Sequence, residues 1–288
     1  MIKETFNFDG IAIKAHEARC LTLMAIHAAG SGHPGGSLSC IDILSVLFSY
    51  MHYNPSDINL VDRDRFVLSK GHAAPALYAV AALSGYIPIT TLNDLRKIGT
   101  KLQGHPHVGS TPWVESSTGS LGQGFSVALG MALGLRHHGI NSRVFALLGD
   151  GEMQEGQVWE ALMCAAHFRL SRLCAILDYN KLQSDDFNTN IMKLEPLVDK
   201  IRSFGWSLLE IDGHDFDAIF SAFEKAGKNA EMPTFILAHT VKGAGVDFME
   251  NRPEWHGSVK LSDDDLKRAL VALGVADSEM MRFFNEKF

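Results

Sequence analysis

The sequence predicts an α/β fold in which a parallel sheet is covered by helices on both faces. Three observations support this: apolar runs of strand length, helix-length segments between them, and glycines where several of the runs end. Parallel strands need crossover connections, and helices in those crossovers bury both surfaces of the sheet. Because the 288 residues contain no repeat and no Pro-rich linker, we expect one domain over residues 1–288.

The individual elements can be placed in chain order from the spacing of apolar residues. A spacing of three and four residues predicts helices, and short continuous runs predict strands. The expected helices cover 11–29, 39–51, an Ala-rich stretch from Gly71 to Leu83, 155–167 and a C-terminal tail of about 262–288. The expected strands cover 66–68, 143–148, 173–179, 206–211 and 234–238. Residues 99–119 have little periodicity and many His, Pro, Gly and Ser residues, which predicts a functional loop.

Composition excludes several classes of protein. Hydrophobic residues make up 46% of the chain, and 26 basic against 33 acidic residues leave a net charge of −7. Because no basic run could follow a phosphate backbone, we expect no nucleic-acid partner. No apolar stretch approaches the roughly 20 residues of a membrane span, and the opening residues lack the apolar core that a signal sequence needs, so we expect neither. The four cysteines form no CxxC pair and are expected to be core thiols, so we expect a cytoplasmic protein.

The most specific motif joins two neighbouring strands. Gly149-Asp150-Gly151 follows one strand, and 28 residues, 152 to 179, separate it from Asn180 at the end of the next strand. Since the carboxyl ends of parallel strands meet at one edge of a sheet, the aspartate and the asparagine should lie close together. Oxygen ligands of this kind suit Mg²⁺ or Ca²⁺, and Mg²⁺ commonly pairs them with ligand phosphates.

This motif resembles the cofactor motif of the thiamine-diphosphate enzymes, and other segments resemble the transketolase family in particular. The likeness covers most of residues 10–260 and implies a thiamine-diphosphate-binding fold. The segments that carry it are Ser31-Gly32-His33-Pro34-Gly35-Gly36, Leu68-Ser69-Lys70-Gly71-His72-Ala73, Gly104-His105-Pro106, Ser117-Thr118-Gly119-Ser120-Leu121-Gly122-Gln123-Gly124 and Glu254-Trp255-His256-Gly257.

The resemblance implies specific roles for residues in these segments. Asp150, Asn180 and the main-chain carbonyl of Leu182 would bind Mg²⁺ (or Ca²⁺), and His33, His72, His105 and His256 would be catalytic. Imidazole suits proton transfer to and from sugar oxygens because its ordinary pKa lies near neutral pH. The implied contacts to thiamine diphosphate come from Gly119, Ser120, Leu121, Gly122, Gly149, Asp150, Gly151, Glu152, Asn180 and His72.

Three glutamates need separate interpretation, and three positions differ from the family pattern. The helix dipole explains an acidic Glu152 in a first turn. Glu155 and Glu160 match family glutamates of a buried acidic cluster between paired active sites, a hypothesis that two exposed carboxylates would contradict. Ser120 stands where the family has Pro, Leu182 where it usually has Ile, and Lys70 precedes Gly-His; none of these removes a proposed ligand.

The resemblance also implies a function. Family members are usually more than twice this long, so we expect the N-terminal subunit of a split transketolase that moves a two-carbon ketol unit between sugar phosphates. A C-terminal partner subunit, in a probable α₂β₂ assembly, would supply the activating glutamate and most phosphate-binding arginines. Alternatives are the α subunit of a 2-oxoacid dehydrogenase first component, a deoxyxylulose-phosphate synthase and a noncatalytic assembly subunit. Nicotinamide binding is disfavoured because the glycines run GxxGxG rather than GxGxxG.

Overall fold

Within residues 6–276, which the computed structural model describes, five strands form one entirely parallel sheet. The strands are β1 (Arg65–Leu68), β2 (Val144–Gly149), β3 (Leu173–Tyr179), β4 (Ser207–Asp212) and β5 (Thr234–His239). Their order across the sheet is β1-β2-β3-β5-β4. Each expected strand is confirmed to within two residues at either end.

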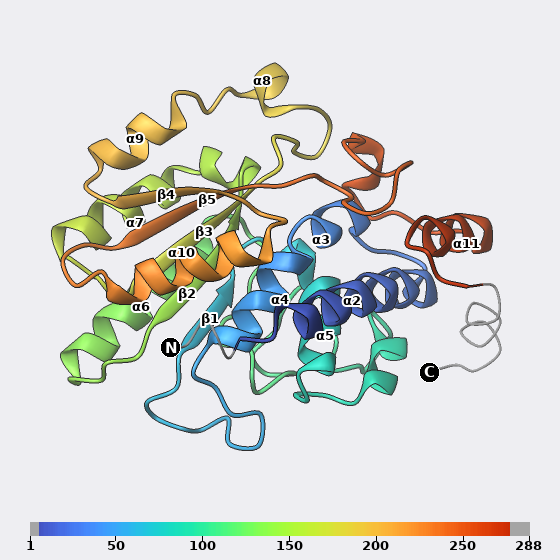
Figure 1. Ribbon diagram of the computed structural model, residues 1–288, viewed down its shortest axis with the longest axis horizontal. Coiled ribbons are helices and arrows are strands. Elements are labelled where there is room, and N and C mark those ends of the chain that lie inside the picture. The colour runs from blue at the N-terminus through green and yellow to red at the C-terminus, as the bar shows by residue number, and fades with distance from the viewer. Residues whose placement is uncertain (1–5, 277–288) are drawn as a thin grey trace.

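Helices cover both faces of the sheet, as predicted (Figure 1). One face packs on α2 (Phe8–Ala29), α4 (Ile41–Tyr50), α5 (Ala74–Leu83) and α10 (Phe216–Lys228). The other face packs on α6 (Gln123–His137), α7 (Gly156–His167) and α9 (Leu197–Ser203). Successive strand residues therefore enter opposite cores: Phe145 and Leu147 join the first, whereas Ala146 and Leu148 join the second.

Short elements complete the described chain. They are α3 (Pro34–Leu38), α8 (Asn188–Ile191), α11 (Asp263–Ala272) and the short 3₁₀ helices η1 (Gly71–Ala73), η2 (Ile89–Asp94), η3 (Gly151–Gln154) and η4 (Pro253–Trp255). In the described part of the expected tail helix, the structure has α11, which begins at a capping box of Ser262 and Asp265 and ends at Ala272. Residues 277–288 of the expected tail lie outside the described residues.

The sequence prediction assigned no element to 123–137, where the structure has α6. Glycines within this segment interrupt its apolar pattern, and its buried face consists of only a few residues, including Phe125, Ala128 and Ala132. The helix predicted for 39–51 is confirmed as α4, which begins after Cys40 because that residue has a non-helical backbone; the short helix α3 precedes it. None of the helices found between residues 6 and 276 combines the length and apolarity that a bilayer crossing needs.

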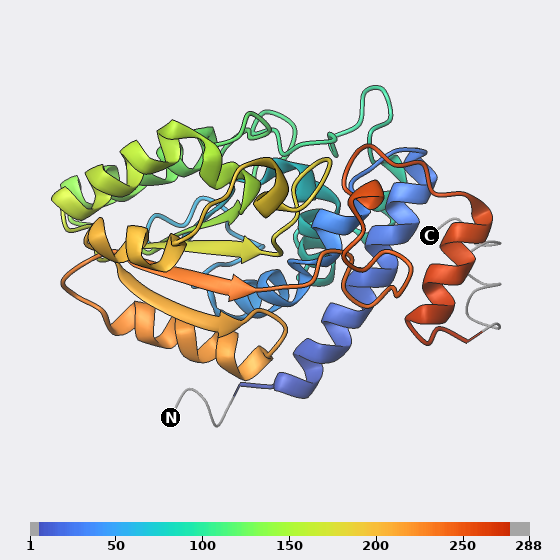
Figure 2. The ribbon, with the colours of Figure 1, turned by 90° about the horizontal axis from the view of Figure 1, so that it is seen from above.

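All strands point the same way, so their carboxyl ends meet α3 and the segment after β5 (Figure 2). That segment also reaches the start of the chain: Gly32 and Val259 form an antiparallel bridge, with N–H···O distances of 3.0 and 2.8 Å. The predicted functional loop 99–119 contains turns and no helix or strand. These connections bring residues from both ends of the chain to one edge of the sheet.

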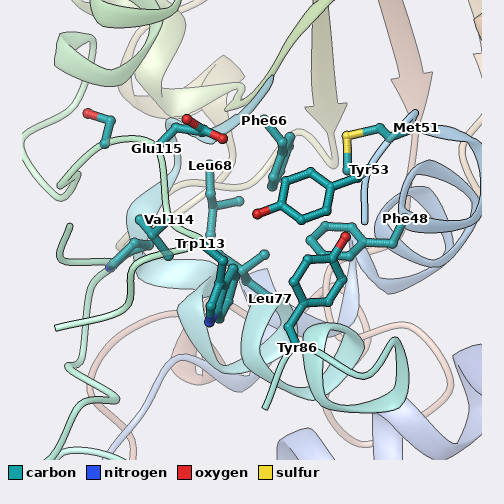
Figure 3. Close-up of a pocket in the computed structure, with 12 residues that line it drawn as sticks. Phe48, Met51, Tyr53, Phe66, Leu68, Leu77, Tyr86, Trp113, Val114 and Glu115 are labelled. Carbon is teal, nitrogen blue, oxygen red and sulfur yellow. The ribbon is translucent and has the colours of Figure 1, made fainter. Parts of the chain in front are cut away.

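A separate aromatic cavity lies on the side of β1, between α4, α5 and the 99–119 loop (Figure 3). Phe48, Tyr53, Tyr86 and Trp113 line it, and its volume is about 20 Å³. The Tyr53 hydroxyl and the Trp113 indole N–H are buried there without a protein partner. Since this volume holds about one water molecule, the cavity is too small for a cofactor or a sugar.

Candidate functional site

A pocket of about 220 Å³ opens at the carboxyl edge of the sheet. Strand β1 leads into Lys70 and His72, β2 into Asp150, β3 into Asn180 and β5 into Lys242; all five residues line the pocket. In parallel α/β sheets, ligands bind at this edge. The prediction that Asp150 and Asn180 come together is confirmed.

Asp150, which follows β2, lies beside the tight turn after β3 that contains Asn180 and Leu182. One Asp150 carboxylate oxygen accepts from the Gly151 amide at 2.8 Å, and the other accepts from the Lys181 amide. The Asn180 side-chain oxygen accepts from the Leu182 amide at 3.1 Å. Lys181 has a φ of 68°, and this left-handed turn folds the Asn180 segment back beside Asp150.

The donor set fits a cation. The Leu182 carbonyl accepts from the Lys242 ammonium at 2.7 Å, which shows that this oxygen faces a positive charge. Burial and the nearby Asp178 carboxylate raise the pKa of Asp150 to about 6, so its charge is poorly compensated by the protein. Burial lowers the pKa of Lys242 to about 8 even though Asp150 opposes that shift. The Lys242 ammonium thus shows that a cation is accommodated beside the Leu182 carbonyl.

The chemistry of these ligands favours Mg²⁺ that is shared with a phosphate group. No group of three His, Cys, Asp or Glu side chains able to hold a metal occurs in residues 6–276. Asp150 provides one carboxylate, and the other two oxygens belong to an amide and a main-chain carbonyl. Mg²⁺ bound by one or two protein carboxylates usually completes its octahedron with water and ligand phosphates.

The four histidines singled out in the sequence gather beside the pocket. The ring centroid of His33 lies 5.5 Å from that of His72, 6.0 Å from His105 and 6.2 Å from His256; the His72 and His256 centroids are 5.1 Å apart. Gly36 makes room for this group, since a Cβ there would lie 2.7 Å from His72 Nε2. The cluster joins four segments that are far apart in the chain.

The surroundings of these histidines shift their pKa values downward. Burial, followed by the Arg96 charge, lowers the pKa of His33 to about 4; burial, followed by Lys242, lowers that of His256 to about 3. Burial also lowers the pKa of His72 and His105. Burial and then the neighbouring positive charges therefore favour neutral imidazoles in this chain, and proton exchange near neutral pH stays a prediction for the assembled enzyme.

A buried ion pair that the sequence analysis did not identify lies under the pocket. Asp178, fully buried, accepts hydrogen bonds from the Lys70 ammonium and Thr240 hydroxyl, and from the Ser39 hydroxyl at 2.5 Å. Lys70 also donates to the Gly36 carbonyl at 2.8 Å. Two features of the sequence could have indicated this pair: an aspartate two residues before Asn180, and a lysine directly before Gly71-His72. The pair fixes Lys70 at the base of the pocket.

Glu152 binds the protein's own loops, so the helix-dipole explanation for this residue is wrong. Its side chain is buried and accepts from the Ser69 hydroxyl, from the Gly122 amide at 2.9 Å and from the Gly149 amide at 3.1 Å. Burial raises the pKa of the carboxyl despite these three donors. One carboxylate thus connects three of the loops that border the pocket.

The remaining predicted residues are divided between the pocket and its surroundings. Leu121, Gly149 and Gly151 line the pocket, whereas Gly119 lies against His105, with an added Cβ 3.2 Å from the ring. Ser120 is exposed and does not line the pocket. Glu155 and Glu160 are both exposed, which contradicts the predicted buried acidic cluster, because no part of residues 6–276 buries these two side chains.

Comparison with known proteins gives a consistent result. The family profile described as "Transketolase, thiamine diphosphate binding domain" matches residues 12–286. The chain is 45% identical over 261 residues to the 6-deoxy-6-sulfo-D-fructose transketolase subunit SqwG of Clostridium sp. (strain MSTE9), which covers 90% of this chain and 94% of that relative. It is 39% identical over 252 residues to an apulose-4-phosphate transketolase subunit of Actinobacillus succinogenes, covering 87% and 91%.

Longer relatives and solved structures match only in part of their length. Human transketolase is 42% identical over 245 residues, which is 84% of this chain but 39% of the human protein. The crystal structure of transketolase from Campylobacter jejuni matches 96% of this chain and 46% of its own, with a TM-score of 0.88 and 30% identity. The match to solved structures confirms the predicted fold class.

Proposed function

Because the chain belongs to the transketolase family, we propose that it is the N-terminal, diphosphate-binding subunit of a split enzyme. The enzyme would transfer a two-carbon ketol unit from a ketose phosphate to an aldose phosphate, and this chain would act only with a C-terminal partner subunit, in an α₂β₂ assembly. The chain spans nearly all of two relatives that are themselves named as subunits, which supports the division. A cytoplasmic location, where thiols stay reduced, would suit four cysteines that form no disulfide with one another in the described part of the chain.

The observation that carries the proposal is the convergence of Asp150, Asn180 and Leu182 with four histidines at one sheet edge. Asp150, the Asn180 amide and the Leu182 carbonyl would hold Mg²⁺. Residues 1–288 would form the single domain that provides this site. The Gly151 amide and Lys242 would face the diphosphate. When bound, thiamine diphosphate would supply the carbon that takes up the ketol unit. His33, His72, His105 and His256 would orient sugar hydroxyls through neutral imidazole hydrogen bonds.

Reconstitution with a C-terminal transketolase subunit from the same organism tests the activity. We expect ketol transfer from a ketose phosphate to an aldose phosphate by the mixture and none when either protein is assayed separately. Donors should include unmodified, branched and 6-sulfonated ketoses, since relatives are named for different sugars. Decarboxylation of a 2-oxoacid without ketol transfer would refute the proposal.

Metal dependence tests the site itself. Binding of thiamine diphosphate to the reconstituted complex, followed by calorimetry, should be lost on chelation and restored by Mg²⁺. Asp150→Ala and Asn180→Ala should each weaken that binding at least about tenfold, which corresponds to about 1.4 kcal/mol. Asp199→Asn, an exposed substitution on α9, is the control and should leave binding unchanged. Unchanged binding in D150A would refute the assignment of the ligands.

A further inference from the structure

Arg96 is held beside the histidine cluster by an uncommon backbone conformation. Its φ is 60°, in the left-handed region that non-glycine residues rarely adopt, and its amide donates to the Leu102 carbonyl at 2.9 Å. Gly104 leaves the space for its side chain, since a Cβ there would lie 2.8 Å from Arg96 Nε. Backbone and packing together fix where the guanidinium lies, and such strain tends to occur at functional positions.

The guanidinium makes two side-chain contacts. One terminal nitrogen, Nη1, donates to the Ser31 hydroxyl at 2.8 Å, and the other, Nη2, lies 3.2 Å from His33 Nδ1. Arginine has donors only and stays charged in proteins, so His33 Nδ1 must be the acceptor. An imidazole that accepts at Nδ1 has its proton on Nε2.

We propose that Arg96 is a positioning residue that fixes His33 as the neutral Nε2–H tautomer. His33 then presents an N–H donor to the substrate, instead of a base that removes a proton. The tautomer follows from this chain's own geometry, and its use toward a sugar oxygen rests on the proposed function. Within residues 6–276, the hydrogen bond of the His33 ring is made by Nδ1, and Nε2 is left available for a ligand.

The other charged and titratable groups around His33 support a neutral ring. His72 from η1, His105 from the 99–119 loop and His256 after η4 all face it. The positive charges of Arg96, Lys242 and Lys70 oppose its protonation, in addition to burial. The main influences on its pKa are burial and positive or imidazole groups, with no carboxylate among them, and all of them disfavour an imidazolium.

Nitrogen NMR of the ¹⁵N-histidine-labelled chain tests the tautomer directly. The His33 signals can be assigned by their loss in His33→Gln. We expect Nδ1 to show the shift of an unprotonated nitrogen and Nε2 that of a protonated one at pH 7.5. Arg96→Met removes the donor but keeps the aliphatic stem, and should give a mixture of tautomers. Arg96→Lys retains a cationic donor and should keep the Nε2–H form.

Arg169→Met is a matched control. Arg169 also has a positive φ, 49°, but it follows α7 at the amino-terminal edge of the sheet, so its loss should leave the His33 signals unchanged. A protonated Nδ1 in the unmodified chain, or the same tautomer in R96M, would overturn the proposal. The unmodified chain gives this answer even if R96M does not fold.

Kinetics of the reconstituted complex separate this inference from the proposed function. R96M should lower kcat about 10- to 100-fold with a smaller change in KM, and R96K should recover most of the loss. Absence of ketol transfer in the unmodified complex would refute the proposed function and leave the NMR result standing. An active complex in which R96M retains full kcat would refute the role of Arg96.

Discussion

Asp178→Asn is a stringent test of how the pocket is built. Asp178 is fully buried, and its partner Lys70 has a side chain that is only 1% exposed. An asparagine would retain one acceptor oxygen for Ser39 or Thr240, but it would leave the Lys70 ammonium buried without an opposite charge. Breaking a buried pair in this way costs about 3–5 kcal/mol, because the remaining charge is uncompensated.

The expected loss is large enough to measure in two ways. Urea unfolding followed by circular dichroism should show a free energy of unfolding about 3–5 kcal/mol lower in D178N at pH 7.5. The thermal midpoint should fall by about 6–20 °C. Replacing both partners, as in K70M/D178N, should cost less than the sum of the single changes, since the double variant has no unpaired ammonium.

The sign of the pH dependence follows from the two pKa shifts. Burial opposes both charges, yet Lys70 keeps the pKa of Asp178 below 3.8, and Asp178 keeps that of Lys70 above 10.5. The contribution of the pair is therefore complete between these ordinary values. It is lost as pH falls through the folded pKa of Asp178 or rises through that of Lys70. The difference in the free energy of unfolding between the unmodified chain and D178N should therefore become smaller at low pH and at high pH.

An exposed ion pair provides the control. Asp94 and Lys97 lie three residues apart, with an N···O distance of 3.3 Å and side chains that are 57% and 54% exposed. Asp94→Asn should change the free energy of unfolding by less than about 0.5 kcal/mol. If D178N costs no more than D94N, the argument from buried charge is refuted.

Three further predictions concern the loops and the histidines. Glu152→Ala should lower the free energy of unfolding by about 2–4 kcal/mol, because two buried amides lose their acceptor. Glu152→Gln, which keeps one acceptor oxygen, should lower it less. Equal losses of the two variants in urea unfolding would contradict this explanation. The thermal midpoint should fall as pH drops from 6.5 towards 4, because His33 and His256 bind protons more readily in the unfolded chain than in the folded one. In His33→Gln the thermal midpoint should depend less steeply on pH. In the reconstituted complex, His33→Ala and His105→Ala should each lower kcat/KM by about 10²-fold, because each removes a hydrogen bond that orients the sugar, while cofactor binding persists. Unchanged turnover in both variants would show that the two histidines are structural.

The sheet and the meeting of Asp150 with Asn180 could be predicted because their signals are local. The apolar runs at 143–148 and 173–179 end in Gly149-Asp150 and Asn180, so two strand positions and one fold rule were enough to bring them together. Helix α6 escaped prediction because its glycines weaken the apolar period by which a helix is identified. Its position is set by packing against the sheet, which no local pattern records.

The electrostatics of the site could not be predicted from residue types. His33 was expected to exchange protons near neutral pH, but the structure places Arg96, 63 residues away in the chain, at 3.2 Å from its ring. Glu152 likewise matched a helix-dipole position, although its partners Ser69 and Gly122 come from other loops. These properties depend on contacts distant in sequence and on burial, and both arise only from the tertiary fold.

The bridge between Gly32 and Val259 has a consequence for synthesis of the chain. His33 and His256 belong to the two segments that this bridge ties together, so the site cannot close until residue 259 has left the ribosome. A nascent chain that already has the whole sheet, through His239, would still lack one wall of its binding site. Chains that stop before residue 259 should therefore be unable to complete this wall of the site.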